Sequence, residues 1–285
     1  MKNALVVFNY NAGRKKAVLH KKIIHKFLLT RCSLFKFVSI DELDNTDLNG
    51  YDTIFAVGGD GTVNKVARII AGTNMTLAII PSGTANLLAA KLGIPSNLKK
   101  ALKIIDKNNI KKIDALNINN SPSFLRCGFG YDSDIICKTP QSLKNDFGYF
   151  AYFLAGIIFA LKLKIRPYDI NIDGRDIRIN ASCIIVANSA NMYQNCVSVG
   201  RNNELDDGLM DIFVLNTKNP VLFFIEFLKI LLNIKFNTKK TKYFKTNKLI
   251  IKNNWIACHI DGEKMKLKND INVSVIPKIL SIYSK

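Results

Sequence analysis

Two short loops of small residues, each set between an apolar run and a helical pattern, constrain this chain more than any other feature. The first, GGDGT, follows the apolar run 53–57 and precedes a helix expected from Val63. The second, PSGTAN, follows the run 77–80 and again opens a helix. Loops after successive parallel strands meet at one edge of a sheet, where α/β folds bind ligands. The two loops therefore predict a parallel sheet with a binding edge.

Strand and helix patterns alternate through the first third of the chain. Apolar runs predict strands at residues 4–9, 35–39, 53–57 and 77–80. Helical spacing predicts helices at residues 15–29, 63–71, 86–92 and 98–106, the last of them capped by Ser96. This alternation is typical of a parallel sheet covered by helices on both faces.

The pattern changes after residue 111. Short strand-like runs separated by turn residues fill the rest of the chain, interrupted by helices expected at 149–163 and 221–232. We therefore expect an α/β N-terminal domain with a parallel sheet and a mostly antiparallel β second domain. The predicted boundaries are residues 1–120 and 121–276, with residues 277–285 returning to the first domain.

The net charge favours anionic partners. Lys and Arg number 41 against 22 Asp and Glu, a formal charge of +19. Such a charge attracts nucleic acid, acidic lipid or phosphorylated ligands, although a base composition that favours Lys and Asn explains it equally well. The sequence contains no recognised nucleic-acid module, so we expect no nucleic-acid partner.

The cysteine and hydropathy patterns indicate a cytoplasmic protein. None of the six cysteines forms a CxxC pair and most lie in apolar runs, which predicts reduced, buried thiols. The longest uncharged stretch, residues 147–161, is shorter than the roughly 20 residues that a spanning helix needs. The first residues show no secretory pattern. Any membrane contact is therefore expected to be peripheral.

The glycines of the first loop suit a phosphate ligand. Gly58, Gly59 and Gly61 let the backbone approach a ligand closely, and the helix N-terminus that follows favours an anion. Asp60 could then orient a ribose, a metal or a metal-bound water. The alternative is an ordinary tight turn that needs glycine, with Asp60 as a helix cap.

An ordered set of motifs resembles the diacylglycerol kinase catalytic domain family, which includes sphingosine kinases and bacterial lipid kinases. NYNAG (9–13), GGDGTVN (58–64) and PSGTANLLA (81–89) are similar to its three nucleotide loops. Later segments match in the same order: LRCGFGYD (125–132), VANSANMY (186–193), LDDGLMD (205–211) and HIDGE (259–263). The resemblance covers nearly the whole chain and implies a fold similar to NAD kinase and diacylglycerol kinase.

The resemblance implies phosphoryl transfer from ATP, with Mg²⁺, to a lipid hydroxyl in a cleft between two domains. It places the catalytic carboxylate, which would accept the proton of the attacking alcohol, at Asp261. A structural metal held in some bacterial members would fall on Glu204, Asp206 and Asp207. The residues that it places at the nucleotide are Asn9, Gly58, Gly59, Asp60, Gly61, Thr62, Gly83, Thr84 and Glu263.

Simpler structural roles remain open for the acidic motifs. Asp261-Gly262 separates two expected strands, and Asp-Gly is a favoured hairpin pair, so a turn there could also present a catalytic base. The segment Asp206-Asp207-Gly208 is compatible with a turn as well as with a metal site.

Two further observations qualify the resemblance. Lys65 stands where the family usually has Glu, so any role of that carboxylate has no group to perform it here. The histidines lack metal-binding spacing, and we expect His20, His25 and His259 in surface or core positions.

A Lys-rich stretch with aromatic residues, 235–252, follows the apolar helix expected at 221–232. The pair could dock the protein on an anionic membrane surface that holds a lipid substrate. A solvated, flexible loop is the expectation that we favour for this stretch.

Three functions compete. The first is a lipid kinase, acting on diacylglycerol to give phosphatidic acid or on a sphingoid base, peripherally associated with the membrane. The second is a soluble-substrate kinase, chiefly NAD kinase, which shares GGDGT but fits PSGTANLLA and HIDGE less well. The third is a lipid- or nucleotide-binding module without catalysis, suggested by Lys65. A homodimer is compatible with each.

Overall fold

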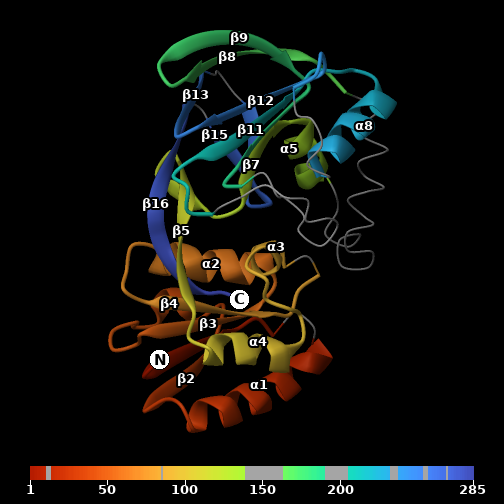
Figure 1. Cartoon of the computed structure of the whole chain (residues 1–285). Helices are drawn as coiled ribbons and strands as arrows, with labels where there is room; N and C mark the ends of the chain where they lie inside the picture. The colour runs from red at the N-terminus through yellow and green to blue at the C-terminus, as the bar shows by residue number, and fades with distance from the viewer. Residues whose placement is uncertain are drawn as a thin grey trace. The chain divides into compact units, whose positions relative to one another are not determined.

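The computed structural model of the chain divides into two compact units (Figure 1). The first comprises Met1–Ile113 and Lys278–Lys285, and the second comprises Asp114–Pro277. The chain therefore passes between the units twice, within β5 (Ile110–Ile118) and within β16 (Ile271–Tyr283). The structure describes residues 1–10, 14–84, 86–138, 163–189, 205–231, 237–252, 256–267 and 269–285.

The first unit is built on a parallel sheet, as predicted. β1, β3 and β4 are almost entirely buried, which is expected of continuous apolar strands in a sheet covered on both faces. Each neighbouring pair in this sheet is parallel. The strand order is β2 (Leu34–Ser39), β1 (Asn3–Phe8), β3 (Thr53–Gly58), β4 (Thr76–Pro81) and then the last residues of β16.

Helices lie on both sides of this sheet (Figure 1). α1 (Arg14–Leu29) and α4 (Leu98–Asp106) lie on one side, and α2 (Asp60–Ile70) and α3 (Leu87–Lys91) lie on the other. α2 packs on β3 and β4 because its apolar residues recur at helical spacing and form one buried stripe. The buried apolar residues of α2 are Val63, Val66, Ala67 and Ile70. A short 3₁₀ helix, η1 (Leu43–Asn45), follows β2.

The cap of α4 differs from the prediction. Asn97, not Ser96, caps this helix, because its Oδ1 accepts a hydrogen bond from the Lys100 N–H at 3.1 Å. A cap side chain must bond an amide two or three residues ahead, and Asn97 stands at that distance from Lys100.

The second unit contains a six-stranded antiparallel sheet and the antiparallel strands of the ten-stranded sheet to which β1–β4 also belong, which confirms the predicted antiparallel domain. The first has the order β12 (Thr241–Thr246), β11 (Met210–Leu215), β10 (Cys183–Ala187), β7 (Arg126–Gly130), β14 (Ile256–Ile260) and β15 (Glu263–Leu267). In the second, β16 is followed by β13 (Lys248–Lys252), β8 (Arg166–Ile172) and β9 (Arg175–Ala181), and β5 pairs with β16 and with β6 (Ser121–Ser123).

Apolar side chains from the two sheets form one core in this unit. Phe129 and Val186 come from the first sheet and pack with Ile170, Leu249 and Val273 of the second. A separate cluster joins the other face of the first sheet to α5 (Tyr131–Lys138) and α8 (Pro220–Leu231). This second cluster holds α5, which carries part of the candidate site, against β10 and β11.

Several segments depart from the sequence expectations. Residues 241–252 form β12 and β13 rather than a flexible loop, because β12 pairs with β11 along its full length and buries Thr241 and Thr246. One strand, β16, crosses the domain boundary predicted at residue 276 and runs to Tyr283, since it continues through Pro277 and the left-handed Lys278. Of the helix expected at 149–163, only its last residue lies within the described residues.

The thiols agree with the prediction where the structure describes them. Cys127, Cys183 and Cys258 are buried thiols, and the Cys32 thiol is half-buried. Burial raises the pKa of the Cys127 and Cys183 thiols. No helix among the described residues has the length and hydropathy needed to cross a membrane.

Candidate active site

The two glycine turns of the first unit are packed directly against each other. The Ser82 N–H donates to the Gly58 carbonyl at 2.8 Å, so the loop after β4 is bonded to the end of β3. A Cβ on Gly59 would lie 3.2 Å from Gly83 Cα, and a Cβ on Gly83 would overlap Gly59 Cα. Gly83 must therefore lack a side chain for the turns to approach this closely, and a side chain on Gly59 would require the facing turn to shift slightly.

Polar side chains fix the geometry of these turns. Asn86 accepts a hydrogen bond from the Gly83 N–H at 3.0 Å and donates one to the Gly83 carbonyl at 2.7 Å. Asn86 has a φ of +50°, a left-handed conformation that Asn tolerates better than most residues. Asp60 Oδ1 accepts a hydrogen bond from the Leu87 N–H at 2.6 Å, which links the start of α2 to the start of α3. Thr84 lies exposed beside the second turn.

A third loop joins this edge of the sheet. Asn9, directly after β1, donates from Nδ2 to Thr62 Oγ1 at 3.2 Å. Gly61 lies in the first turn of α2, where it is exposed and where an added Cβ would meet nothing within 4 Å. The structure thus brings the predicted residues Asn9, Gly58 to Thr62 and Gly83 together at one edge.

This edge fits a phosphate-bearing ligand. The N-terminus of α2 opens at Gly59, and helix N-termini favour anions. Asn64 is 3% exposed, and neither its amide oxygen nor its amide nitrogen has a hydrogen-bond partner. Because buried amides are normally hydrogen-bonded, a water or a polar atom of a ligand is expected beside Asn64.

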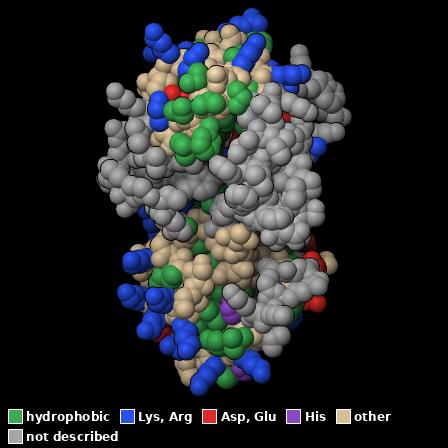
Figure 2. All heavy atoms as spheres, turned by 90° about the vertical axis from the view of Figure 1, so that its right-hand side faces the viewer, with side chains coloured by type: hydrophobic (Ala, Val, Ile, Leu, Met, Phe, Trp, Pro, Cys, Tyr) green, Lys and Arg blue, Asp and Glu red, His purple; other side chains and the backbone are tan. Residues whose placement is uncertain are grey.

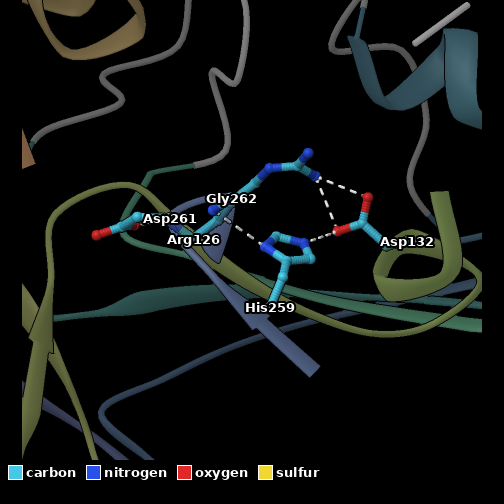
Figure 3. A network of polar contacts seen from close by, with 5 residues as sticks. All are labelled: Arg126, Asp132, His259, Asp261 and Gly262. Carbon is cyan, nitrogen blue, oxygen red and sulfur yellow. Dashed lines mark hydrogen bonds and ion pairs between the residues drawn. The ribbon is translucent and has the colours of Figure 1, made fainter. Parts of the chain in front are cut away.

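In the second unit, Asp261 lies at the tip of the hairpin between β14 and β15. Asp261 and Gly262 have φ of +51° and +90°, so both are left-handed, as in a two-residue type I′ turn. The carboxylate points away from the buried side chains of His259 and Asp132 (Figure 3). The structure therefore confirms the turn, and the turn presents the carboxylate.

Four hydrogen bonds orient the Asp261 carboxylate. All four donors belong to the segment from the end of β6 to the start of β7. Oδ2 accepts from the Phe124 N–H at 3.2 Å, and Oδ1 accepts from Ser123 Oγ at 2.6 Å, the Leu125 N–H at 3.1 Å and the Arg126 N–H at 3.0 Å. Such a cluster of donors holds the carboxylate in one orientation.

A network of polar side chains is hydrogen-bonded to the backbone of this turn (Figure 3). His259 Nε2 lies 2.6 Å from Asp132 Oδ2, and the Arg126 guanidinium donates to both Asp132 oxygens at 3.1 and 3.0 Å. The Gly262 N–H donates to His259 Nδ1 at 3.4 Å, so the ring proton belongs on Nε2, where it is donated to Asp132. The Asp261 N–H in turn donates to the Arg126 carbonyl at 2.9 Å. The five residues therefore form a closed loop of bonded groups.

Two glycines make room for this network. Gly128 faces His259 across the β7–β14 pair, and a Cβ on Gly128 would overlap the carboxylate of Asp132 and the ring of His259. Gly130 has a φ of +70°, which turns the chain from β7 directly into α5. That turn returns Asp132 to a position over Gly128.

Arg126 and His259 stabilise the charge on Asp132. Burial alone would raise the pKa of this carboxyl, but the guanidinium of Arg126 and the ring of His259 outweigh burial and lower the pKa to about 2. The side chains of Asp132 and His259 are 8% and 0% exposed, so the pair is shielded from water. Asp132 is therefore a buried anion that holds the Arg126 guanidinium and the His259 ring in place.

The remaining predicted residues have other surroundings. Glu263 begins β15 two residues after Asp261 and is exposed. Asp207 accepts a hydrogen bond from the Leu209 N–H at 3.0 Å and pairs with Lys245 Nζ at 2.6 Å, as in a turn tied to β12. Glu204 lies outside the described residues. Within the part of the chain that the structure describes, no three His, Cys, Asp or Glu residues are grouped to hold a metal.

Lys65 has a structural role in place of the carboxylate expected from the family pattern. Its Nζ pairs with Asp44 Oδ2 at 2.7 Å and donates to the Ile40 carbonyl at 3.2 Å. Lys65 therefore ties α2 to the loop after β2.

Sequence reasoning missed Arg126, Asp132 and His259 as a group. Asp132 stood inside the quoted motif LRCGFGYD but received no role, and His259 stood inside HIDGE. The usable signal was a charged residue directly after a glycine-rich strand, because a buried charge there requires a partner.

Two family profiles match the chain. The profile described as Diacylglycerol kinase catalytic domain matches residues 3–118, and the profile described as YegS C-terminal NAD kinase beta sandwich-like domain matches residues 127–284. The second profile alone covers more than half of the chain.

Relatives and a solved structure agree with these profiles. A protein named diacylglycerol kinase in Bacillus subtilis is 26% identical over 276 residues, which is 92% of this chain and 90% of that protein. An uncharacterised Synechocystis protein is 29% identical over 85% of this chain, but the match spans 57% of that protein's length. The fold is shared with a diacylglycerol kinase from Bacillus anthracis (TM-score 0.75, 20% identity, 100% of this chain and 97% of that one). The chain therefore belongs to the diacylglycerol kinase catalytic domain family of lipid kinases.

Proposed function

We propose that this lipid kinase transfers the γ-phosphoryl group of ATP to the free hydroxyl of diacylglycerol, giving phosphatidic acid, ADP and a proton. One observation carries the choice of substrate: the similarity to the Bacillus subtilis diacylglycerol kinase extends over 92% of this chain and 90% of that protein. The proposal assigns donor binding to the first unit and activation of the acceptor to the second.

Donor binding rests on the packed glycine turns. Gly59 and Gly83 leave no side chain over the turns, and the open space at Gly61 allows a phosphate to approach the first amides of α2. The proposal also includes the predicted contacts of Thr84 and Glu263 with the nucleotide. The affinity for ATP of variants at these two positions tests the contacts.

Mg²⁺ would accompany the nucleotide. This ion commonly keeps several waters and takes one or two carboxylates in addition to substrate phosphates, so it needs no cage made only of protein groups. Asp60 stands at the first position of α2, and we expect its carboxylate to assist the ion. When bound, Mg²⁺ would neutralise charge on the transferred phosphoryl group.

Activation of the acceptor rests on Asp261. Phosphoryl transfer passes through a loose transition state, so the carboxylate must chiefly orient the alcohol and receive its proton. The four hydrogen bonds to Asp261 fix that orientation before the substrate arrives. The network behind the turn prevents it from shifting.

The test uses labelled ATP, Mg²⁺ and vesicles that contain diacylglycerol, with phosphatidic acid as the product measured. Asp261→Asn should lower kcat by about 10²- to 10⁴-fold, the usual contribution of a positioned acid or base. ATP binding by calorimetry should be unchanged, because the proposal assigns Asp261 to the acceptor hydroxyl and not to the nucleotide.

Asp173→Asn is a matched control. Asp173 and Gly174 form another left-handed Asp-Gly pair, with φ of +50° and +86°, at the β8–β9 hairpin. This variant should keep full activity. Equal loss in both variants would contradict the assigned role, and NADP formation from NAD without any lipid product would replace the proposal. Phosphorylation of a sphingoid base alone would change the substrate and retain the kinase chemistry.

A further inference from the structure

Helix α8 presents large apolar side chains on its outer face. Among the described residues, ten large hydrophobic side chains are strongly exposed, and five of them belong to this one helix. Figure 2 shows hydrophobic side chains gathered as a patch on the upper part of the molecule, on the side where Figure 1 places α8. The α8 face consists of Val221 (66% exposed), Leu222 (39%), Phe224 (40%), Ile225 (41%) and Leu228 (36%).

The opposite face of the same helix is firmly packed. Phe223 is 7% exposed and Ile230 is 1% exposed, and both belong to the apolar cluster under α8. The Phe223 ring lies 4.7 Å from the ring of Tyr131 in an edge-on contact. α8 is thus a docked helix with a second apolar face left on the surface.

Two lysines are held beside α8 by a buried carboxylate. Glu226 Oε2 accepts hydrogen bonds from Thr238 Oγ1 at 3.1 Å and from Thr241 Oγ1 at 2.8 Å. Lys239 and Lys240 stand between these two threonines, and both are exposed. The turn that carries them is therefore attached to the middle of α8.

Lysines outnumber acidic residues in the segment that carries this face. Between residues 216 and 246 the sequence contains seven lysines and a single acidic residue, Glu226. Glu226 is 7% exposed and pairs with Lys229 at 2.8 Å, so it presents almost no negative charge to solvent. Exposed Lys218 precedes the helix. Lys and Arg side chains border the hydrophobic patch in Figure 2.

This combination fits the surface of an anionic bilayer. Val221, Phe224, Ile225 and Leu228 recur at the spacing of one helical face, as in helices that lie in the membrane interface. The flanking lysines would then lie at the level of the phosphate headgroups. A second copy of the chain is a poorer occupant, because a symmetric contact would bring like-charged lysines together.

We propose that the α8 face, with Lys239 and Lys240 at its margin, docks this protein on an anionic phospholipid surface. The inference rests on the proposed function, since a kinase for diacylglycerol must reach a substrate that stays in the bilayer. Docking itself requires neither ATP nor diacylglycerol, so it is measured separately from catalysis.

The experiment measures sedimentation of the full chain with vesicles that contain no diacylglycerol. One set is pure phosphatidylcholine, and the other is equimolar phosphatidylcholine and phosphatidylglycerol. The wild type should bind the second set, and less so as salt rises. Ile225→Gln with Leu228→Gln should abolish binding. Lys239→Gln with Lys240→Gln should lower the partition coefficient by about 30-fold, as expected for two surface lysines.

Matched controls come from the first unit. Leu19→Gln with Leu29→Gln removes two apolar side chains of α1 that are 58% and 59% exposed. Lys99→Gln with Lys100→Gln removes two adjacent exposed lysines of α4. Both controls should bind like the wild type. Their thermal unfolding, and that of the α8 variants, should match the wild type because every substituted side chain is at the surface.

Three outcomes would overturn the inference. They are no binding of the wild type to phosphatidylglycerol vesicles, equal binding by the α8 and α1 variants, and a dimer in solution that the α8 variant dissociates. Activity distinguishes this inference from the proposed function. The α8 variant should lose activity on diacylglycerol in vesicles and keep it on a water-dispersed short-chain diacylglycerol. A wild type that docks but phosphorylates no lipid would contradict the proposed function alone.

Discussion

His259 and Asp132 stand 127 residues apart in the chain, yet their side chains meet with 2.6 Å between Nε2 and Oδ2 inside the second unit. The other ring nitrogen of His259 accepts the Gly262 N–H, next to Asp261. The pair therefore connects α5 to the turn that presents the proposed catalytic carboxylate, which makes His259 a positioning residue.

His259→Phe should lower kcat at least about tenfold. It should also destabilise the fold by about 2–4 kcal/mol, because the buried Asp132 carboxylate loses one of its hydrogen-bond partners. The KM for ATP should stay the same. Steady-state kinetics on the folded enzyme and denaturant unfolding measure the two effects. His25→Phe, at an exposed position of α1, is the control and should change neither. A folded variant with the wild-type kcat would show that His259 is only structural.

Asp132 should make stability depend on pH in acid. Its folded pKa is about 2, below its ordinary value of 3.8, so the folded state binds this proton more weakly than the unfolded state. The stabilisation is complete above the unfolded pKa and is lost as the pH falls through the folded one, by about 2 kcal/mol in total. Denaturant unfolding as the pH is lowered from neutral through 3.8 to about 2 should show this loss in the wild type.

Asp132→Asn should remove that component of the pH dependence, at the expense of lower stability at neutral pH. Asp106→Asn is the comparison, because Arg31 also lowers the pKa of Asp106 but that carboxylate is 47% exposed. Its effect should be small, as for other surface pairs. Parallel pH profiles for the wild type and Asp132→Asn would contradict the assignment.

Gly61 and Gly83 should respond differently to alanine. At Gly61 a Cβ meets no protein atom within 4 Å, so Gly61→Ala should keep or raise stability, by up to about 1 kcal/mol for a helical site. Its affinity for ATP should fall at least about tenfold if phosphate approaches the first amides of α2. Gly83→Ala should instead lower stability, because its Cβ overlaps Gly59. Calorimetric titration with ATP and thermal unfolding separate the two. Unchanged ATP affinity in Gly61→Ala would argue against phosphate at this helix.

Lys65 should prove dispensable for catalysis. Its ion pair with Asp44 is 35% and 63% exposed, which limits its contribution to about 1 kcal/mol or less. Lys65→Met should therefore unfold slightly more easily and phosphorylate lipid at the wild-type rate. A double-mutant cycle with Asp44→Asn measures the pair. A large fall in kcat for Lys65→Met would assign Lys65 to the reaction.

Local chemistry made the first unit predictable. The glycines of GGDGT and PSGTAN mark turns that follow apolar strands, and both the turns and the parallel sheet follow from neighbouring residues alone. The Asp261-Gly262 dipeptide likewise predicted the hairpin turn that the structure contains.

Long-range pairing made the rest of the candidate site unpredictable. No local pattern states that Asp132 will meet His259, or that the amides beside Ser123 will bond Asp261 more than 130 residues later. These partners are set by the order β10, β7, β14, β15, which the sequence does not encode in any one segment. The α5 helix was missed for a different reason, since it begins directly after β7 through the left-handed Gly130.

The course of β16 has a consequence for how the protein is made. Residues 278–285 belong to the first unit, where Ser281 and Ile282 pair with Thr76 and Leu77 and Tyr283 is buried. A ribosome that has synthesised residue 113 has therefore not yet supplied all of the first unit. That unit can close its sheet only after the whole β-rich unit has been synthesised, and a gene fragment cut at residue 113 should yield an aggregating product with an open strand edge.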